Sequence, residues 1–125
     1  HLTEAAVRLA QAVRLRNAAT FEFLVRDADF AFIEANPRLQ IEHTVTEEVL
    51  GLDLVELQLR LAAGMSLADL GLDPASPPQP RGYAIQIRIN TETMASDGSA
   101  RPAGGTLTAF EPPLGPGVRV DTCAH

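Results

Sequence analysis

The sequence predicts an α+β fold in which helices are combined with an antiparallel sheet. Two short runs rich in aromatic and branched residues, 21–25 and 30–35, flank a polar turn and are typical of a β-hairpin. Residues 1–17 and 44–64 carry apolar side chains at helical spacing. From residue 82 onward the pattern is that of strands and turns. We therefore expect a sheet with helices first, then part of a mainly β subdomain.

Composition limits the classes of protein to which the chain can belong. The 125 residues are 46% hydrophobic, which favours a packed structure over disorder. The formal charge of −6 argues against nucleic acid or an anionic membrane as the main partner. No apolar run reaches the roughly 18 residues of a membrane span. Cys123 is the one cysteine, so no internal disulfide can form, which fits a reducing compartment.

The predicted helices are delimited by capping residues. In the first helix, within 1–17, Thr3 is the expected N-cap. In 44–64, capping-box patterns at 44–47 and 53–56 predict two helices in series, with Gly51 between them and Gly64 after the second. A further short helix is expected from Ser66, within 65–72.

Proline and glycine divide the rest of the chain. Four prolines within 73–80 exclude a helix or a central strand, so this segment is predicted to be a linker or surface loop. Strict alternation predicts a strand over 82–92. Residues 93–105 are expected to form a long polar loop with a turn at Asp97-Gly98, and shorter strands are expected at 106–110 and 118–120.

The two runs of the hairpin each carry one carboxylate among apolar neighbours, Glu22 and Glu34. A two-residue turn would set Glu22 opposite Ile33 and send Glu34 to the other face. A three-residue loop, 27–29, would pair Glu22 with Glu34, and Asp27 and Asp29 tolerate its left-handed position better than alanine does. We predict the three-residue loop and therefore facing carboxylates.

Facing carboxylates repel unless a proton or a cation lies between them. Mg²⁺ or Mn²⁺ suits such an oxygen-rich site, with nucleotide phosphates as further ligands. Asn36 lies two residues beyond Glu34, hence on the same face of a continuing strand, and can add an amide oxygen. After Pro37, alternation in an extended segment would align Arg38, Gln40 and Glu42: an anion clamp with a base beside it. The structural alternative is partly exposed strand carboxylates and an Arg38–Glu42 salt bridge.

The strand predicted at 82–92 has one apolar and one unusually polar face. Its polar face carries Gln86, Arg88 and Asn90, and the two amides could orient the guanidinium or share its ligand. The alternative is an ordinary solvent-facing surface.

These motifs resemble one family. The sequence F-I-E-A-N-P-R-L-Q-I-E-H-T-V-T-E-E, after T-F-E-F-L, is similar to the metal and bicarbonate segment of biotin carboxylases, which are ATP-grasp enzymes. R-G-x-A-I-x-x-R-I-N-x-E, at 81–92, resembles a second motif of the same family. The resemblance runs from about Arg14 to the end of the chain. It implies residues 1–72 as the C-terminal part of an ATP-grasp domain, 73–80 as a linker or loop, and 81–125 as the start of the biotin carboxylase C-terminal domain.

The resemblance also implies an activity: ATP-dependent carboxylation of biotin by bicarbonate, through carboxyphosphate. The implied roles fall into three groups. ATP and its metal ions would be bound by Glu22, Glu34, Asn36 and, near the adenine, Leu24. Bicarbonate would be held by Arg38, Gln40 and the backbone of Ile41, and deprotonated by Glu42. The enolate-like form of biotin would be stabilised by Arg88.

Several further expectations come with the family. The implied partners are a biotin carboxyl carrier domain, a carboxyltransferase and a second copy in a homodimer, with a cytoplasmic location, or a mitochondrial one in a eukaryote. The glycine-rich lid and nucleotide-binding lysines of the family are missing here, so the isolated chain is expected to be inactive. Two alternatives stay open: another ATP-grasp ligase, similar to the carbamoyl-phosphate synthase large chain, and a non-catalytic scaffold or interaction fragment.

Overall fold

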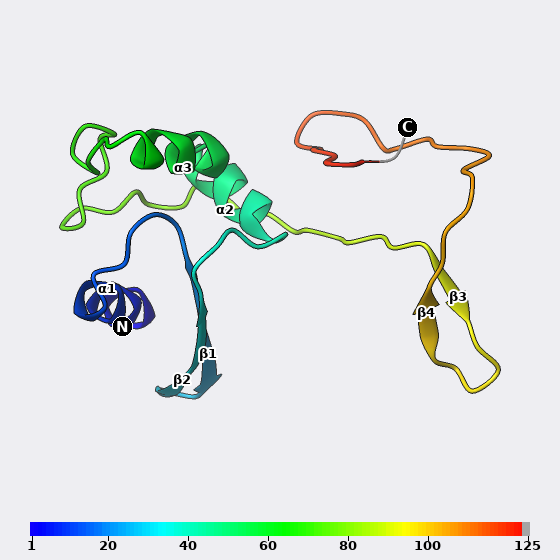
Figure 1. Cartoon of the computed structure of the whole chain (residues 1–125), viewed down its shortest axis with the longest axis horizontal. Helices are drawn as coiled ribbons and strands as arrows, with labels where there is room; N and C mark the ends of the chain where they lie inside the picture. Colours follow the sequence, from blue (N-terminus) through cyan, green and yellow to red (C-terminus); the bar gives the residue numbers. More distant parts are fainter. Residues whose placement is uncertain (124–125) are drawn as a thin grey trace. The chain divides into compact units, whose positions relative to one another are not determined.

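The computed structural model of the chain describes residues 1–123. Helices and strands follow one another in the order α1 (Leu2–Ala12), β1 (Thr20–Arg26), β2 (Asp29–Asn36), α2 (His43–Leu50), α3 (Leu54–Ala62), β3 (Glu92–Met94) and β4 (Ala100–Pro102) (Figure 1). The strands form two separate antiparallel pairs, β1–β2 and β3–β4. The α+β fold class expected from the sequence is confirmed.

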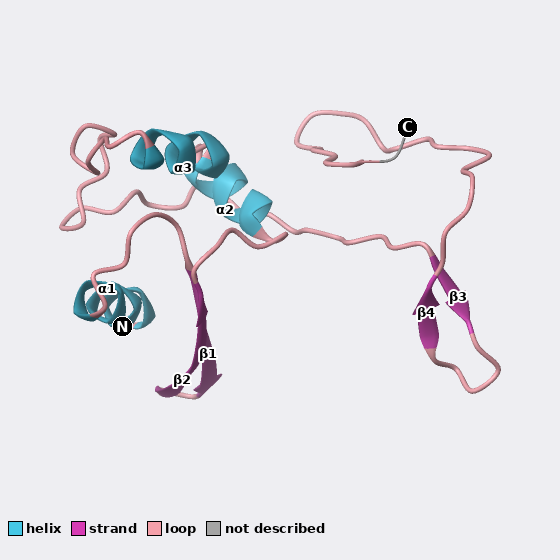
Figure 2. Cartoon of the chain, viewed as in Figure 1, coloured by secondary structure: helices cyan, strands magenta, loops and turns pink. Residues whose placement is uncertain are grey.

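The chain divides into two units, His1–Gln86 and Ile87–His125. The first unit holds the three helices and the longer hairpin, and the second holds the short hairpin (Figure 2). The proline-rich residues 73–80 lie within the first unit as loop, where Asp73 and Ser76 form an isolated antiparallel bridge. The domain ranges 1–72, 73–80 and 81–125 concern the domains of the family and stay a prediction.

The β1–β2 hairpin brings Glu22 and Glu34 opposite each other, but not through the loop that we expected. Arg26 pairs with Asp29 across a two-residue turn, Asp27-Ala28, so the three-residue loop is wrong. Asp27 has a φ of 54°, and a positive φ at the first turn position is what a type II′ turn requires. The register then shifts at a β-bulge: Phe23 pairs with Phe32 and Glu22 with Glu34, which leaves Ile33 as the extra residue. The bulge corrects the register that the short turn would have imposed.

Helix α1 is shorter than the predicted 1–17. Its C-cap is Val13, and Arg14 adopts a left-handed φ of 50°. The N–H of Leu15 donates to the carbonyl of Ala10 at 2.8 Å and that of Arg14 to Gln11 at 3.0 Å, the two hydrogen bonds of a Schellman ending. The predicted Thr3 cap is also wrong, because the helix already begins at Leu2.

Helices α2 and α3 confirm the prediction of two helices in series. Gly51 ends α2 in the left-handed conformation with φ 66°, and Gly64 follows α3 with φ 96°. Asp53 is the N-cap of α3, where its carboxylate accepts a 2.7 Å hydrogen bond from the N–H of Glu56. The capping box expected at 44–47 does not form, because α2 begins at His43 and the side chains of Thr44 and Glu47 bind other partners.

Little of the first unit is buried. Phe23 packs edge-on against Phe30 and Phe32, with ring centroids 5.7 and 5.9 Å apart, and Phe21 lies 6.5 Å from Phe32. Within residues 1–123 only Ala5 and Glu47 are buried, and both belong to helices. Local hydrogen bonds and the aromatic contacts of the hairpin therefore define this unit more than a closed core does.

Several predicted elements of the later part are wrong. Residues 66–71 form hydrogen-bonded turns instead of a helix. Of the strand expected at 82–92, only Glu92 enters a ladder, and Ile85 and Ile89 are 91% and 90% exposed. The expected loop 93–105 contains the β3–β4 hairpin, with the predicted turn at its tip. Neither 106–110 nor 118–120 is a strand. Among the described residues, no helix has both the length and the hydropathy needed to span a bilayer.

Candidate functional site

Four polar side chains meet at the base of the β1–β2 hairpin. The amide nitrogen of Asn36 donates to Glu22 Oε1 and to Glu34 Oε1, at 3.1 Å each. The amide nitrogen of Gln40 donates to the same Glu22 oxygen at 3.2 Å. Glu22 is half-buried and Glu34 exposed. The predicted meeting of the two carboxylates with Asn36 on their face is therefore confirmed as geometry.

The donor set of this cluster fits a hard divalent cation. Two carboxylate oxygens converge on one point, at present served by the N–H groups of an amide, and the same amide can offer its oxygen to a cation after a rotation. Within the described residues no group of three or more His, Cys, Asp and Glu side chains could hold a metal ion by itself. A cation here would thus need further oxygen ligands, as Mg²⁺ does when it binds with substrate phosphates.

The segment between β2 and α2 is a turn and not the extended strand that we expected. The N–H of Arg38 donates to the Asn36 carbonyl at 2.8 Å, and the Arg38 guanidinium donates to the carbonyl of Leu39 at 3.1 Å. Glu42 occupies the N-cap position of α2 with an exposed side chain. No salt bridge joins Arg38 and Glu42 in the part of the chain that the structure describes, so both charges face solvent.

Two residues that the sequence did not single out hold this turn in place. The Gln86 amide donates to the carbonyl of Ile41 at 3.1 Å and accepts from the Thr44 hydroxyl at 3.1 Å. The His43 ring nitrogen Nδ1 lies 2.8 Å from the carbonyl of Gln40. The polar face of 82–92 pointed to Gln86 only as a neighbour of Arg88. Its partners lie 42 and 45 residues away in sequence, where spacing gives no signal.

Arg88 lies in the second unit and is described there by itself. Its guanidinium Nε donates to the amide oxygen of Asn90 at 3.1 Å, and both side chains are exposed. Of the two amides that we expected to flank Arg88, Asn90 therefore orients it. Gln86 belongs to the first unit and binds the turn at Ile41.

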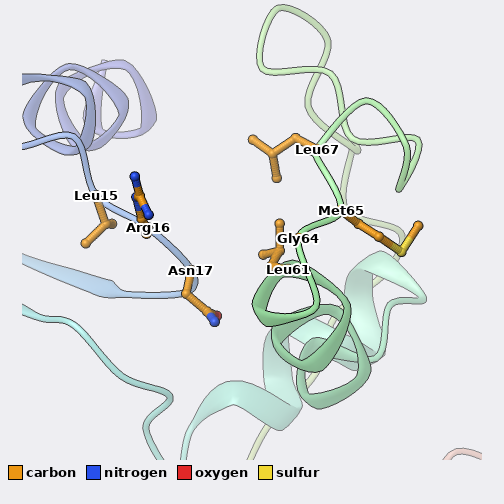
Figure 3. A pocket seen from close by; sticks show the side chains of 7 residues that line it. All are labelled: Leu15, Arg16, Asn17, Leu61, Gly64, Met65 and Leu67. Atoms are coloured by element: carbon orange, nitrogen blue, oxygen red, sulfur yellow. The ribbon is translucent and has the colours of Figure 1, made fainter.

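The hollows of the first unit do not coincide with the cluster. One, of about 320 Å³, is lined by residues of the α1–β1 loop and of the end of α3 and the loop after it: Leu15, Arg16, Asn17, Leu61, Gly64, Met65 and Leu67 (Figure 3). A second, of about 330 Å³, lies between α1 and the hairpin and is largely apolar. Leu24, the residue expected near adenine, lies on β1 opposite Ala31 with its side chain 66% exposed.

Two carboxylates outside the cluster have perturbed acidity. Hydrogen bonds from the side chain and the backbone of Ser66 lower the pKa of Asp69. Ser99 lowers the pKa of Asp97 in the same way, at the tip of the β3–β4 hairpin. Both are surface turns, so these shifts report local turn structure and not the chemistry of the site.

The family of the chain follows from comparison with known proteins. Residues 1–70 match the family described as carbamoyl-phosphate synthase L chain, ATP binding domain. This match covers more than half of the 125 residues, so the chain belongs to this family of ATP-binding domains. The hairpin with its carboxylate pair, the turn and helices α2 and α3 all lie within the matched residues.

Individual relatives narrow the class further. A pyruvate carboxylase of Pichia angusta is 48% identical over 119 residues, which is 93% of this chain and 10% of that protein. A solved structure of a "single-chain, multi-domain long-chain acyl-coa carboxylase" is 52% identical with a TM-score of 0.86, over 93% of this chain and 13% of the other. A second, the "Biotin Carboxylase domain of single-chain bacterial carboxylase", is 60% identical with a TM-score of 0.55, over 60% of this chain and 19% of the other.

The resemblance to biotin carboxylases that the two motifs indicated is therefore confirmed. The chain spans about a tenth of the length of the pyruvate carboxylases that it matches.

Proposed function

We propose that this chain is part of a biotin carboxylase, which uses ATP and bicarbonate to carboxylate biotin on a carrier. The observation that carries the proposal is the joined cluster of Glu22, Glu34, Asn36 and Gln40, followed within two residues by an exposed Glu42. The family of ATP-binding domains and the names of the carboxylase relatives support the same activity.

Glu22, Glu34 and Asn36 are the residues that would hold the metal ion, which we propose to be Mg²⁺ or Mn²⁺. When bound, the ion neutralises the charge of the ATP phosphates. The chain supplies two carboxylate oxygens that already converge and an amide beside them. Leu24, exposed on β1, is proposed to contact the adenine.

The turn after β2 is proposed to bind bicarbonate. The Arg38 guanidinium would bind the anion, with the Gln40 amide and the backbone of Ile41 as further hydrogen-bonding groups. Glu42 would accept the bicarbonate proton, because a carboxylate free of a salt bridge can take up a proton without first breaking an ion pair. The resulting dianion attacks the γ-phosphorus of ATP, the bond to ADP breaks, and carboxyphosphate forms.

Arg88 is proposed to act in the second half of the reaction. Loss of the biotin N1′ proton leaves negative charge on the ureido oxygen, and a guanidinium beside that oxygen stabilises the charge as it develops. The nitrogen then takes the carboxyl group, and phosphate leaves. Asn90, which accepts from Arg88 Nε, leaves the two terminal nitrogens of the guanidinium for biotin.

The proposal extends to partners. The relatives include single-chain, multi-domain carboxylases, and one is named a pyruvate carboxylase subunit. We propose that the full-length protein passes its carboxyl group to a biotin carboxyl carrier domain and on to a carboxyltransferase. It would act as a homodimer in the cytoplasm, or in mitochondria in a eukaryote.

The deciding experiment is ATP cleavage by the full-length protein, with and without bicarbonate and free biotin, beside a Glu42→Gln variant. We expect cleavage that needs bicarbonate, is stimulated by biotin and falls by about 100-fold or more in the variant, the usual contribution of a general base. Glu111→Gln is the matched control, since Glu111 is equally exposed but lies in the second unit.

The other outcomes identify the alternatives. Bicarbonate-dependent cleavage that is indifferent to biotin would favour a carbamoyl-phosphate synthase-like ligase, which the description of the matched family also allows. No ATP cleavage by the folded protein would favour a non-catalytic scaffold.

A further inference from the structure

The His43 ring lies between the bicarbonate turn and the interior of the α2–α3 pair. On one side its Nδ1 is 2.8 Å from the carbonyl oxygen of Gln40. On the other side its Nε2 is 4.0 Å from Glu47 Oε2. The ring is 22% exposed and Glu47 only 6%. His43 is therefore a partly buried side chain with polar groups on both ring edges, directly after the proposed base.

The contact with Gln40 fixes the proton on the ring. A carbonyl oxygen only accepts, so Nδ1 must be the donor in this contact. The backbone N–H of His43 donates to the same Gln40 oxygen at 3.2 Å. One residue thus closes the turn with two hydrogen bonds, and the turn contains Ile41 and Glu42.

Glu47 anchors the ring from behind. Its Oε1 accepts a 2.6 Å hydrogen bond from the N–H of Leu54, in the first turn of α3. This bond fixes the carboxylate at the junction of the two helices, one helical turn after His43 on the same face of α2. Figure 1 shows α2 following directly on the turn that leaves β2.

Gln40 connects this arrangement to the carboxylate cluster. Its carbonyl accepts from His43, while its side-chain amide donates to Glu22 Oε1 at 3.2 Å. The chain of contacts therefore runs from the α2–α3 junction through Glu47, His43 and Gln40 to Glu22. Each link joins a different part of the proposed site, so a shift of the ring would move the turn relative to the cluster.

We propose that His43 is a positioning residue, which, backed by Glu47, holds the turn at 39–42 so that Gln40 reaches Glu22 and Glu42 faces bicarbonate. The proposal rests on the proposed function and deepens it. His43 does not touch the reacting atoms. Its effect is on the binding of bicarbonate, the ligand of the turn, and not on the binding of ATP.

The test compares His43→Ala and His43→Asn in the full-length protein. The Asn amide nitrogen stands close to the position of Nδ1 and can donate to the Gln40 carbonyl, whereas alanine cannot. We expect His43→Ala to raise KM for bicarbonate about three- to tenfold, the usual effect of one lost hydrogen bond, with KM for ATP unchanged. His43→Asn should recover most of that loss. His1→Ala, at an exposed histidine outside the turn, is the matched control.

Hydrogen exchange supplies a readout that does not need turnover. With the Gln40–His43 bonds weakened, the amide of His43 should exchange faster in His43→Ala than in wild type and return toward wild type in His43→Asn. A KM for bicarbonate within twofold of wild type in folded His43→Ala overturns the proposal, and so does unchanged exchange at this amide. If His43→Ala does not fold, His43→Asn decides alone: near-wild-type values support the positioning role and raised values overturn it.

Failure of the proposed function would look different. Wild-type protein would then show no ATP cleavage dependent on bicarbonate, while the exchange comparison would still test whether His43 holds the turn.

Discussion

The arrangement of Asn36 between two carboxylates makes a sharp prediction for Asn36→Asp in the full-length protein. The substitution keeps the size of the side chain and replaces the donating amide by a third carboxylate. Two hydrogen bonds, each 3.1 Å long, become two repulsive contacts. We expect a protein that is less stable without a divalent cation and regains stability when one is added.

The size of the effect follows from the distances. Two like unit charges 3.1 Å apart repel by about 1.3 kcal/mol at the dielectric constant of water and by about 5 kcal/mol at an effective value of 20. Glu34 is exposed and Glu22 half-buried, so the lower value is the better guide. Two such contacts cost about 3 kcal/mol, which corresponds to a fall in Tm of about 5–10 °C for a domain of 150–250 residues.

Thermal unfolding in EDTA and in Mg²⁺ measures this effect. We expect Asn36→Asp to melt about 5–10 °C below wild type in EDTA and to recover at least half of that difference in Mg²⁺. Asn90→Asp is the matched control, because it adds the same charge beside the Arg88 guanidinium and away from the cluster. Its Tm should differ little from wild type and respond to Mg²⁺ as wild type does.

Two results would refute the reasoning. If Asn36→Asp melts with wild type in EDTA, Asn36 does not separate the two carboxylates in solution. If it is destabilised but Mg²⁺ restores nothing beyond the gain seen in wild type, three converging carboxylates do not form a cation site here.

Three further predictions concern other parts of the chain. Asp53→Ala should lower the free energy of unfolding by about 1 kcal/mol in urea titrations while Asp53→Asn costs less than half of that, because asparagine still caps a helix; equal losses would show that the cap is not the cause. Gln86→Ala should raise KM for bicarbonate about three- to tenfold, because the Ile41 carbonyl loses its donor, and an unchanged KM would exclude that link from the site. Asp97 has a pKa below its ordinary value of 3.8 because of Ser99, so its stabilisation of the hairpin turn is complete above that value and is lost as the pH falls through the lowered pKa; in an NMR titration Ser99→Ala should return the pKa toward 3.8, and no change would contradict this cause.

The carboxylate pair shows what the sequence can and cannot predict. The two acidic residues among apolar neighbours correctly indicated a shared site, because the carboxylates of Glu22 and Glu34 gain a purpose only if they meet. The route to the meeting was missed. The two-residue turn and the bulge at Ile33 compensate for each other, and pattern alone does not distinguish this pair of shifts from one longer loop.

Helix ends were predictable where a special residue marks them. Gly51, Gly64 and Asp53 adopt the roles that their chemistry favours. The end of α1 was not predictable, because Arg14 takes the left-handed position that glycine usually occupies.

Strands depend on partners in a way that helices do not. The alternation over 82–92 is clear, but among the described residues no strand pairs with 82–91, and a strand exists only through its ladder. The supports of the turn, His43 and Gln86, were missed for a related reason. The ring and the amide act through contacts that only the folded chain creates.

The bulge at Ile33 also separates two kinds of sequence change in the hairpin. Substitutions in the turn at Asp27-Ala28 leave the residue count of β2 untouched, so the turn is free to drift. Loss of Ile33 alone, an apolar residue that holds no ligand, would set Glu34 back by one position and turn it to the opposite face from Glu22. The acidic pair is thus conserved by strand length as much as by charge: a deletion that keeps every carboxylate would still abolish the site.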